Sequence, residues 1–245
     1  MNIPKIVFKK LSLEETIDNI IWTYFDDGFH DDTVSMFPEL GNIDKSLSKK
    51  EIEDKISELF TRYYKCNQNN IDNDIKKYND LWNKYNDKYM EVLSEYLNID
   101  WGNIKTIYAY VGIVCICPRY LDDNSFVIGA NFNDESVIRI CAHECLHFIW
   151  FRKWKELYKD SKREEFETPH IVWKYSEMVT DSIINSKKIK NIIHVNEKSY
   201  SYFYDYDNNG ENVMSKLKDI FNEDVNIEER IKKGFDYVKD YFKGE

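Results

Sequence analysis

Residues 136–151, SVIRICAHECLHFIWF, constrain the fold more than any other part of the chain. They contain no Gly or Pro, and apolar side chains lie nearly all round the helix that they predict. Such a helix belongs in the interior of a protein, so the rest of the chain must surround it. Two preceding segments, residues 106–117 and 125–131, are rich in β-branched and aromatic residues. They predict buried strands, with a turn at residues 121–124 between them.

Most of the remaining sequence is typical of helices, because only 8 Gly and 4 Pro interrupt 245 residues. Ser12 with Glu15 and Ser48 with Glu51 have the spacing of a capping box, which predicts two helix starts. Residues 5–10 predict a short strand and residues 26–45 a loop. A break at 67–70 would separate the second helix from a third, over about 75–96. We expect these two helices to form an antiparallel hairpin. The alternative is that the third helix carries a seam that binds a partner.

The C-terminal half continues this pattern. Thr168 and Pro169 predict the start of a helix through residue 184, with Thr at the N-cap and Pro at the first helical position. Residues 192–195 and 200–206 suggest a hairpin, and 213–221 and 227–242 suggest two helices. We therefore expect a single α+β domain over residues 1–245. It comprises a mainly helical part (1–100), a core (101–190) and a C-terminal part (191–245).

Charge and composition exclude some classes of function. The formal net charge of −10 argues against a nucleic-acid partner, which would need a positive face. No apolar stretch approaches the roughly 20 residues of a membrane span, and the first residues lack the features of a secretory signal. The five cysteines have no disulfide-scaffold spacing. We expect a cytoplasmic protein with reduced thiols, and the sequence does not indicate its oligomeric state.

The interior helix carries a chemical motif, His143-Glu144-Cys145-Leu146-His147. Positions i and i+4 lie about 40° apart around a helix, so both imidazoles can bind one tetrahedral metal ion. Glu144 lies about 100° from His143 on the same half of the helix. It can activate a water on the metal without binding the metal itself, which is the arrangement that metal-assisted hydrolysis requires. A pair of core histidines without a metal is the alternative.

A catalytic site needs a third ligand and an open fourth position. Glu177 is favoured because it lies on the predicted helix after Pro169, with Asp181 one turn later. Asp181 could then accept the outer N–H of a ligating imidazole. The other downstream candidates are Glu164, Glu165, Glu167, His170 and Asp181 itself.

These residues resemble the zincin metallopeptidases, and His143, Glu144, His147, Glu177 and Asp181 match the gluzincin branch. The resemblance covers roughly residues 105–186. It implies a zincin-like core, with a small sheet, an active-site helix and helical additions at both ends, and a zinc cofactor. It also implies an edge strand that holds a peptide or protein substrate, here Phe126 to Asn131 with Gly129 and Ala130. Relatives often add a Tyr or His that stabilises the transition state, and the candidates are His194, Tyr200, Tyr202 and Tyr204.

The sequence therefore predicts a zinc-dependent peptidase in which Glu144 is the general base. Two alternatives stay open. The same site could hydrolyse a non-peptide amide or another small substrate, or the metal could be a structural zinc retained in an interaction protein.

Overall fold

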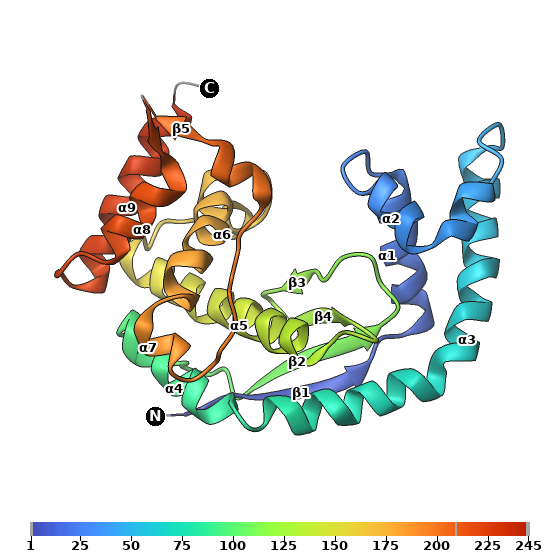
Figure 1. Cartoon of the computed structure of the whole chain (residues 1–245), viewed down its shortest axis with the longest axis horizontal. Coiled ribbons are helices and arrows are strands. Elements are labelled where there is room, and N and C mark those ends of the chain that lie inside the picture. Colours follow the sequence, from blue (N-terminus) through green and yellow to red (C-terminus); the bar gives the residue numbers. More distant parts are fainter. Residues whose placement is uncertain (1, 209, 244–245) are drawn as a thin grey trace. The chain divides into compact units, whose positions relative to one another are not determined.

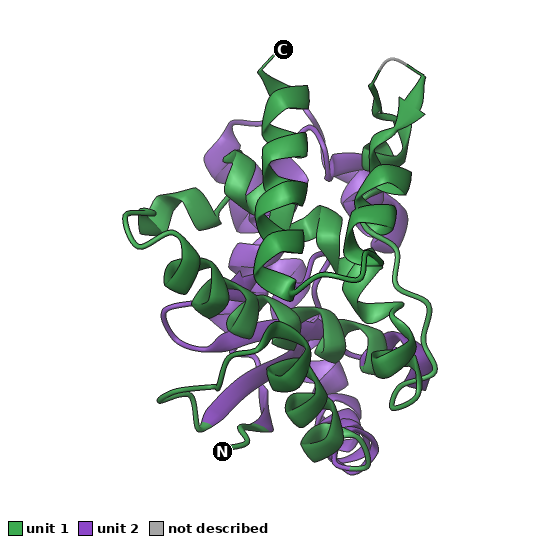
Figure 2. Cartoon of the chain, turned by 90° about the vertical axis from the view of Figure 1, so that its left-hand side faces the viewer, with its two compact units in different colours: residues 1–5, 84–105, 138–245 green, residues 6–83, 106–137 purple. Residues whose placement is uncertain are grey.

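The computed structural model describes residues 2–208 and 210–243. The chain divides into two compact units (Figure 2). Residues 6–83 and 106–137 form the sheet unit, and residues 1–5, 84–105 and 138–245 form the helical unit. The expectation of a single domain stays a prediction. In the described part of the chain, no helix is both long enough and apolar enough to cross a bilayer.

The sheet unit contains a mixed four-stranded sheet in the order β1-β2-β4-β3 (Figure 1). Its strands are β1 (Lys5–Lys10, of which Lys5 belongs to the helical unit), β2 (Thr106–Gly112), β3 (Arg119–Tyr120) and β4 (Ser125–Gly129). β2 and β4 are parallel, with Tyr108 opposite Ser125, whereas β3 is antiparallel to β4. All five residues of β4 are buried; β2 pairs with β4 along its whole length, and β3 pairs with Ser125 and Phe126. The expectation of an edge strand over residues 126–131 is wrong at Phe126, where β3 takes the edge position, and it stays a prediction for the residues that follow.

Three α-helices and a 3₁₀-helix complete the sheet unit. They are α1 (Leu13–Phe25), α2 (His30–Met36), η1 (Pro38–Asn42) and α3 (Lys49–Trp82). Both predicted capping boxes are confirmed, with Glu15 and Glu51 as the reciprocal partners of Ser12 and Ser48. A cluster of buried apolar side chains joins α1, α2–η1 and α3, and it includes Ile20, Phe37, Leu40 and Phe60.

Two predictions in this region are wrong. Residues 26–45 contain α2 and η1 in addition to loop, and α3 continues through residues 67–70 without a break. Asparagine costs only a few tenths of a kcal/mol in a helix, so the buried Ile71 and the turns on either side outweigh it. The Asn67 side chain also donates to the Tyr63 carbonyl one turn earlier (2.9 Å). The predicted hairpin is therefore absent from this stretch, and the chain leaves α3 only at residue 83.

The helical unit consists mainly of packed helices. They are α4 (Asn86–Leu97), α5 (Asp134–Leu157, of which 134–137 belong to the sheet unit), η2 (Arg163–Phe166), α6 (Ile171–Ile184), α7 (Lys187–Lys190), η3 (Ser201–Asp205), α8 (Val213–Phe221) and α9 (Ile227–Phe242). Two short strands, β5 (Asp207–Asn208) and β6 (Glu211–Asn212), form a hairpin. Helices α6, α8 and α9 pack together, and aromatic rings such as Trp154 and Phe235 fill the space next to α5 (4.7 Å between centroids).

The predicted interior position of α5 is confirmed. Every residue from 137 to 151 is buried except Arg139 and His143, which are half-buried. The bounds predicted for the last two helices are also confirmed. The hairpin predicted over 192–206 is wrong, because that segment holds η3 and an irregular stretch, and the two-stranded hairpin follows it. Helix α6 begins at Ile171 with His170 at the N-cap, two residues later than predicted.

Candidate metal centre

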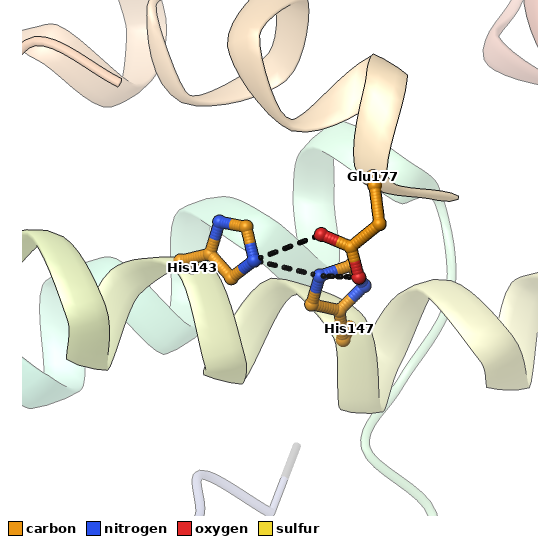
Figure 3. Close-up of side chains that lie close together, drawn as sticks. All are labelled: His143, His147 and Glu177. Atoms are coloured by element: carbon orange, nitrogen blue, oxygen red, sulfur yellow. Dashed lines mark hydrogen bonds and ion pairs between the residues drawn. The ribbon is translucent and has the colours of Figure 1, made fainter. Parts of the chain in front are cut away.

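Three side chains of the helical unit converge on one point (Figure 3). His143 and His147 come from successive turns of α5, and Glu177 comes from α6. The two Nε2 atoms lie 3.0 Å apart. His143 Nε2 is 3.2 Å from Glu177 Oε2, and His147 Nε2 is 3.2 Å from Glu177 Oε1. The structure thus brings together the three residues that the sequence proposed as ligands.

The local sequence explains this convergence. The i, i+4 spacing on α5 aligns the two imidazoles along one side of the helix. Glu177 lies in the middle of a buried run on α6, residues 175–180, so its carboxylate faces the interior of the unit. His147 is fully buried, while 17% of the His143 side chain is exposed. His143 is therefore the most exposed of the three side chains.

The spacing fits a tetrahedral metal ion. Donors bound at about 2.0–2.1 Å in a tetrahedral zinc site lie about 3.3 Å apart. The distances of 3.0–3.2 Å between the three donors are close to that value. Two imidazole nitrogens and a carboxylate suit zinc, and they also suit other divalent ions with N/O preference. The geometry supports a metal site without selecting zinc.

The electrostatics of the cluster favour a positive charge at its centre. Burial opposes a charge on His143, but hydrogen bonds and the charges of Glu177 and Glu197 outweigh it and raise the pKa of His143 well above its ordinary value. Burial also opposes the charge on Glu177, and the two imidazoles outweigh it and hold the pKa of Glu177 well below its ordinary value. The site stabilises either a proton or a cation between these groups.

Glu144, the proposed general base, is buried on α5 with 7% of its surface exposed. Among the described residues, the convergent group comprises His143, His147 and Glu177 and does not include Glu144. This arrangement is compatible with a residue that acts on a water and leaves the metal to the other three. Glu164, Glu165, Glu167 and His170, the other candidate ligands, also lie outside that group.

The structure corrects the prediction that Asp181 accepts the outer N–H of a ligating imidazole, because another carboxylate contacts His143. Glu197, and not Asp181, lies there: its Oε1 is 3.0 Å from His143 Nδ1. Asp181 instead accepts hydrogen bonds from Asn185 and from the Tyr204 hydroxyl (2.8 Å). Sequence reasoning missed Glu197 although a signal existed, since Ile193, Val195 and Glu197 occupy the buried positions of an alternating stretch.

The four candidate transition-state donors have different surroundings. His194 is exposed. The Tyr204 hydroxyl contacts Asp181 and accepts from the Ser199 amide (3.1 Å). Tyr200 and Tyr202 are partly exposed and stack on one another, with centroids 5.6 Å apart. Burial, then Tyr206, then the charge of Glu177 raise the pKa of Tyr202 to about 12. Tyr202 therefore combines a hydroxyl that stays protonated at neutral pH with access to solvent.

The proposed substrate strand belongs to the sheet unit, and its backbone is largely engaged there. The Gly129 carbonyl accepts from the Tyr78 hydroxyl (3.1 Å), and the Ala130 amide donates to the Gly112 carbonyl (2.7 Å). The Asn131 amide donates to Asp74 (2.8 Å). A peptide would have to compete for these groups, so residues 129–131 are poorly suited to hold a substrate backbone.

Comparison with models of known protein families, with curated proteins and with solved structures finds no match to this chain. The case for a function therefore rests on the site itself.

Proposed function

We propose that this chain is a zinc-dependent metallopeptidase with a zincin-like core, acting on a peptide or protein substrate. The observation that carries the proposal is the convergence of His143, His147 and Glu177 from two helices, with Glu144 on the same turn of α5 as His143. Three protein ligands are typical of catalytic zinc sites, whereas structural sites use four. Within the described residues the convergent group has three members, which favours catalysis over a structural role.

A zinc ion at this site would supply Lewis acidity, polarising the scissile carbonyl and acidifying a water. Glu144 would accept a proton from the attacking water on a carboxylate oxygen as that water adds to the carbonyl carbon. It would then deliver the proton to the leaving nitrogen, which departs as an amine. Tyr202 keeps its phenolic proton at neutral pH, since its pKa is about 12, and can donate a hydrogen bond to the developing oxyanion. His143, His147 and Glu177 would hold the ion from two helices that contact one another through Trp150 and Tyr175 (5.6 Å between ring centroids).

Substituting Glu144 tests this proposal. Glu144→Gln keeps the size of the side chain but cannot accept the proton, so the variant should bind zinc, fold normally and lose cleavage by roughly 10² to 10⁴. The assay is digestion of a peptide library, read by mass spectrometry, with zinc content measured in parallel. Chelator-treated parent protein should be inactive. Glu135→Gln, an exposed substitution in the first turn of the same helix, should cleave like the parent.

The outcomes separate the alternatives. Equal cleavage by parent, Glu144→Gln and chelated protein would reveal a contaminant. Fully bound zinc without cleavage of any peptide would reject the peptidase in favour of a non-peptide hydrolase or a structural zinc. Loss of zinc from Glu144→Gln would show that this residue is a ligand and that its role as base is wrong.

A further inference from the structure

We propose that Glu197 is a positioning residue of the metal centre, which sets the tautomer and orientation of His143. The inference rests on the proposed metal site and extends it to a segment of the chain outside the motif on α5. Glu197 lies 20 residues after Glu177, on the irregular stretch between α7 and η3.

The contact with His143 determines which ring nitrogen faces the metal centre. Glu197 Oε1 lies 3.0 Å from His143 Nδ1, and the Glu197 side chain is fully buried. A carboxylate can only accept, so the hydrogen of a neutral imidazole resides on Nδ1. The lone pair is then on Nε2, the atom that lies 3.0 Å from His147 Nε2 and 3.2 Å from Glu177. Glu197 thereby prepares His143 to act as a ligand.

The surroundings of Glu197 also stabilise the charge of its carboxylate. Burying a carboxylate is costly unless it is paired, and an apolar residue would pack here at lower cost. Glu197 Oε2 forms an ion pair with Arg139 (3.8 Å), which lies one turn before His143 on α5. Glu197 therefore contacts two successive turns of the helix that carries both imidazoles.

The backbone of the segment is tied to α6, which carries the third ligand. The Asn185 side chain donates to the Glu197 carbonyl (2.9 Å) and accepts from the Glu197 amide (3.1 Å). Two residues later, the Ser199 hydroxyl donates to the Glu177 carbonyl (2.8 Å). Asp181 contacts Asn185, so it supports Glu197 indirectly. The segment thus couples the position of Glu197 to that of Glu177.

A series at position 197 tests the proposal through zinc affinity, measured by competition with a chelator. Glu197→Ala removes the acceptor and should weaken binding about 10- to 100-fold. Glu197→Gln keeps an acceptor oxygen but loses the charge, so its affinity should fall between those of Glu197→Ala and the parent. Glu211→Gln changes the net charge equally at an exposed position, and its affinity should equal that of the parent.

A spectroscopic measurement distinguishes positioning from general support of the fold. In the zinc-loaded parent the His143 Nδ1 proton should give a slowly exchanging downfield NMR signal, which Glu197→Gln keeps and Glu197→Ala loses. If Glu197→Ala does not fold, Glu197→Gln alone must still bind zinc more weakly than Glu211→Gln. Equal affinities across the series would overturn the proposal and leave the metal site standing. A parent that binds no zinc would overturn both. Graded affinities without peptide cleavage would support the role of Glu197 and reject only the peptidase.

Discussion

Tyr202 is the residue outside the ligand set whose environment best suits a part in the proposed chemistry. Its ring stacks on Tyr200 and contacts Phe203 (4.5 Å between centroids), which restricts its motion. Its pKa of about 12 keeps the phenol protonated throughout the neutral range. A protonated donor held in place can stabilise charge that develops only in the transition state.

Replacing this hydroxyl should therefore affect turnover more than binding. We expect Tyr202→Phe to lower kcat about 10²- to 10³-fold with KM nearly unchanged, the effect of losing one oxyanion donor. Steady-state kinetics on a peptide cleaved by the parent would measure it. The matched control is Tyr200→Phe, on the stacked neighbour. Equal losses in the two variants would contradict a specific role for the Tyr202 hydroxyl.

Helical periodicity explains which site residues could be predicted. Spacing within one helix was enough to predict His143, Glu144 and His147. Glu177 could be predicted because it lies on a helix whose start is marked by Thr168 and Pro169. Glu197 could not be predicted in the same way, because its contact with His143 spans 54 residues and depends on an irregular segment. Asp181 satisfied the spacing rule, yet the fold uses it to hold Asn185 and Tyr204.

At the scale of elements, a buried lysine joins three helices of the helical unit. Lys153 on α5 is almost fully buried and donates to Glu228 at the start of α9 (2.5 Å), to Glu156 (2.7 Å) and to the Asn98 carbonyl at the end of α4 (3.3 Å). Burial opposes the charge on Glu228, but the Lys153 hydrogen bond, with further bonds, outweighs it and lowers the pKa of Glu228. Removing Glu228 would leave a buried ammonium with weaker compensation.

This pair should make stability depend on pH. Because the pKa of Glu228 is lower in the folded state, its contribution is present above the unfolded value of 4.5 and is lost as the pH falls through the folded value. Glu228→Gln should cost about 1.5–3 kcal/mol at pH 7, and the difference from the parent should shrink below about pH 4.5. Urea unfolding at several pH values measures it. Glu156→Gln, at a more exposed partner of Lys153, should cost less, and a gap that does not shrink at all as the pH falls below 4.5 would contradict the assignment.

Element boundaries were predictable where local signals are strong. Capping boxes located the starts of α1 and α3, and amphipathic periodicity located α8 and α9. The helix break predicted at residues 67–70 was wrong because differences in intrinsic helix propensity are small compared with the free energy of tertiary packing. β3 has only two residues, too few to show any periodicity.

At the scale of the whole molecule, an α+β fold was predictable and its strand order was not. The β-branched runs identify β2 and β4 as strands, but nothing in them indicates that they are parallel neighbours or that β3 covers the outer side of β4. Strand order depends on which distant segments pair, and a single sequence carries little information on that. The division into sheet and helical units is likewise a property of contacts between segments far apart in the chain.

The segment between α7 and η3 has a consequence for the rates at which its amides exchange with solvent deuterium. Residues 193–200 have no regular secondary structure. The Glu197 amide donates to the Asn185 side chain and the Ser199 amide to the Tyr204 hydroxyl, so each depends on one side chain. We expect both to exchange faster than the amides of α5 and to slow down when zinc binds, because the ion would hold His143 against Glu197. Asn185→Ala should abolish the slowing at Glu197, whereas Lys198→Ala, an exposed substitution, should leave it unchanged. Rates at Glu197 that do not respond to zinc would show that metal occupancy and the order of this segment are independent.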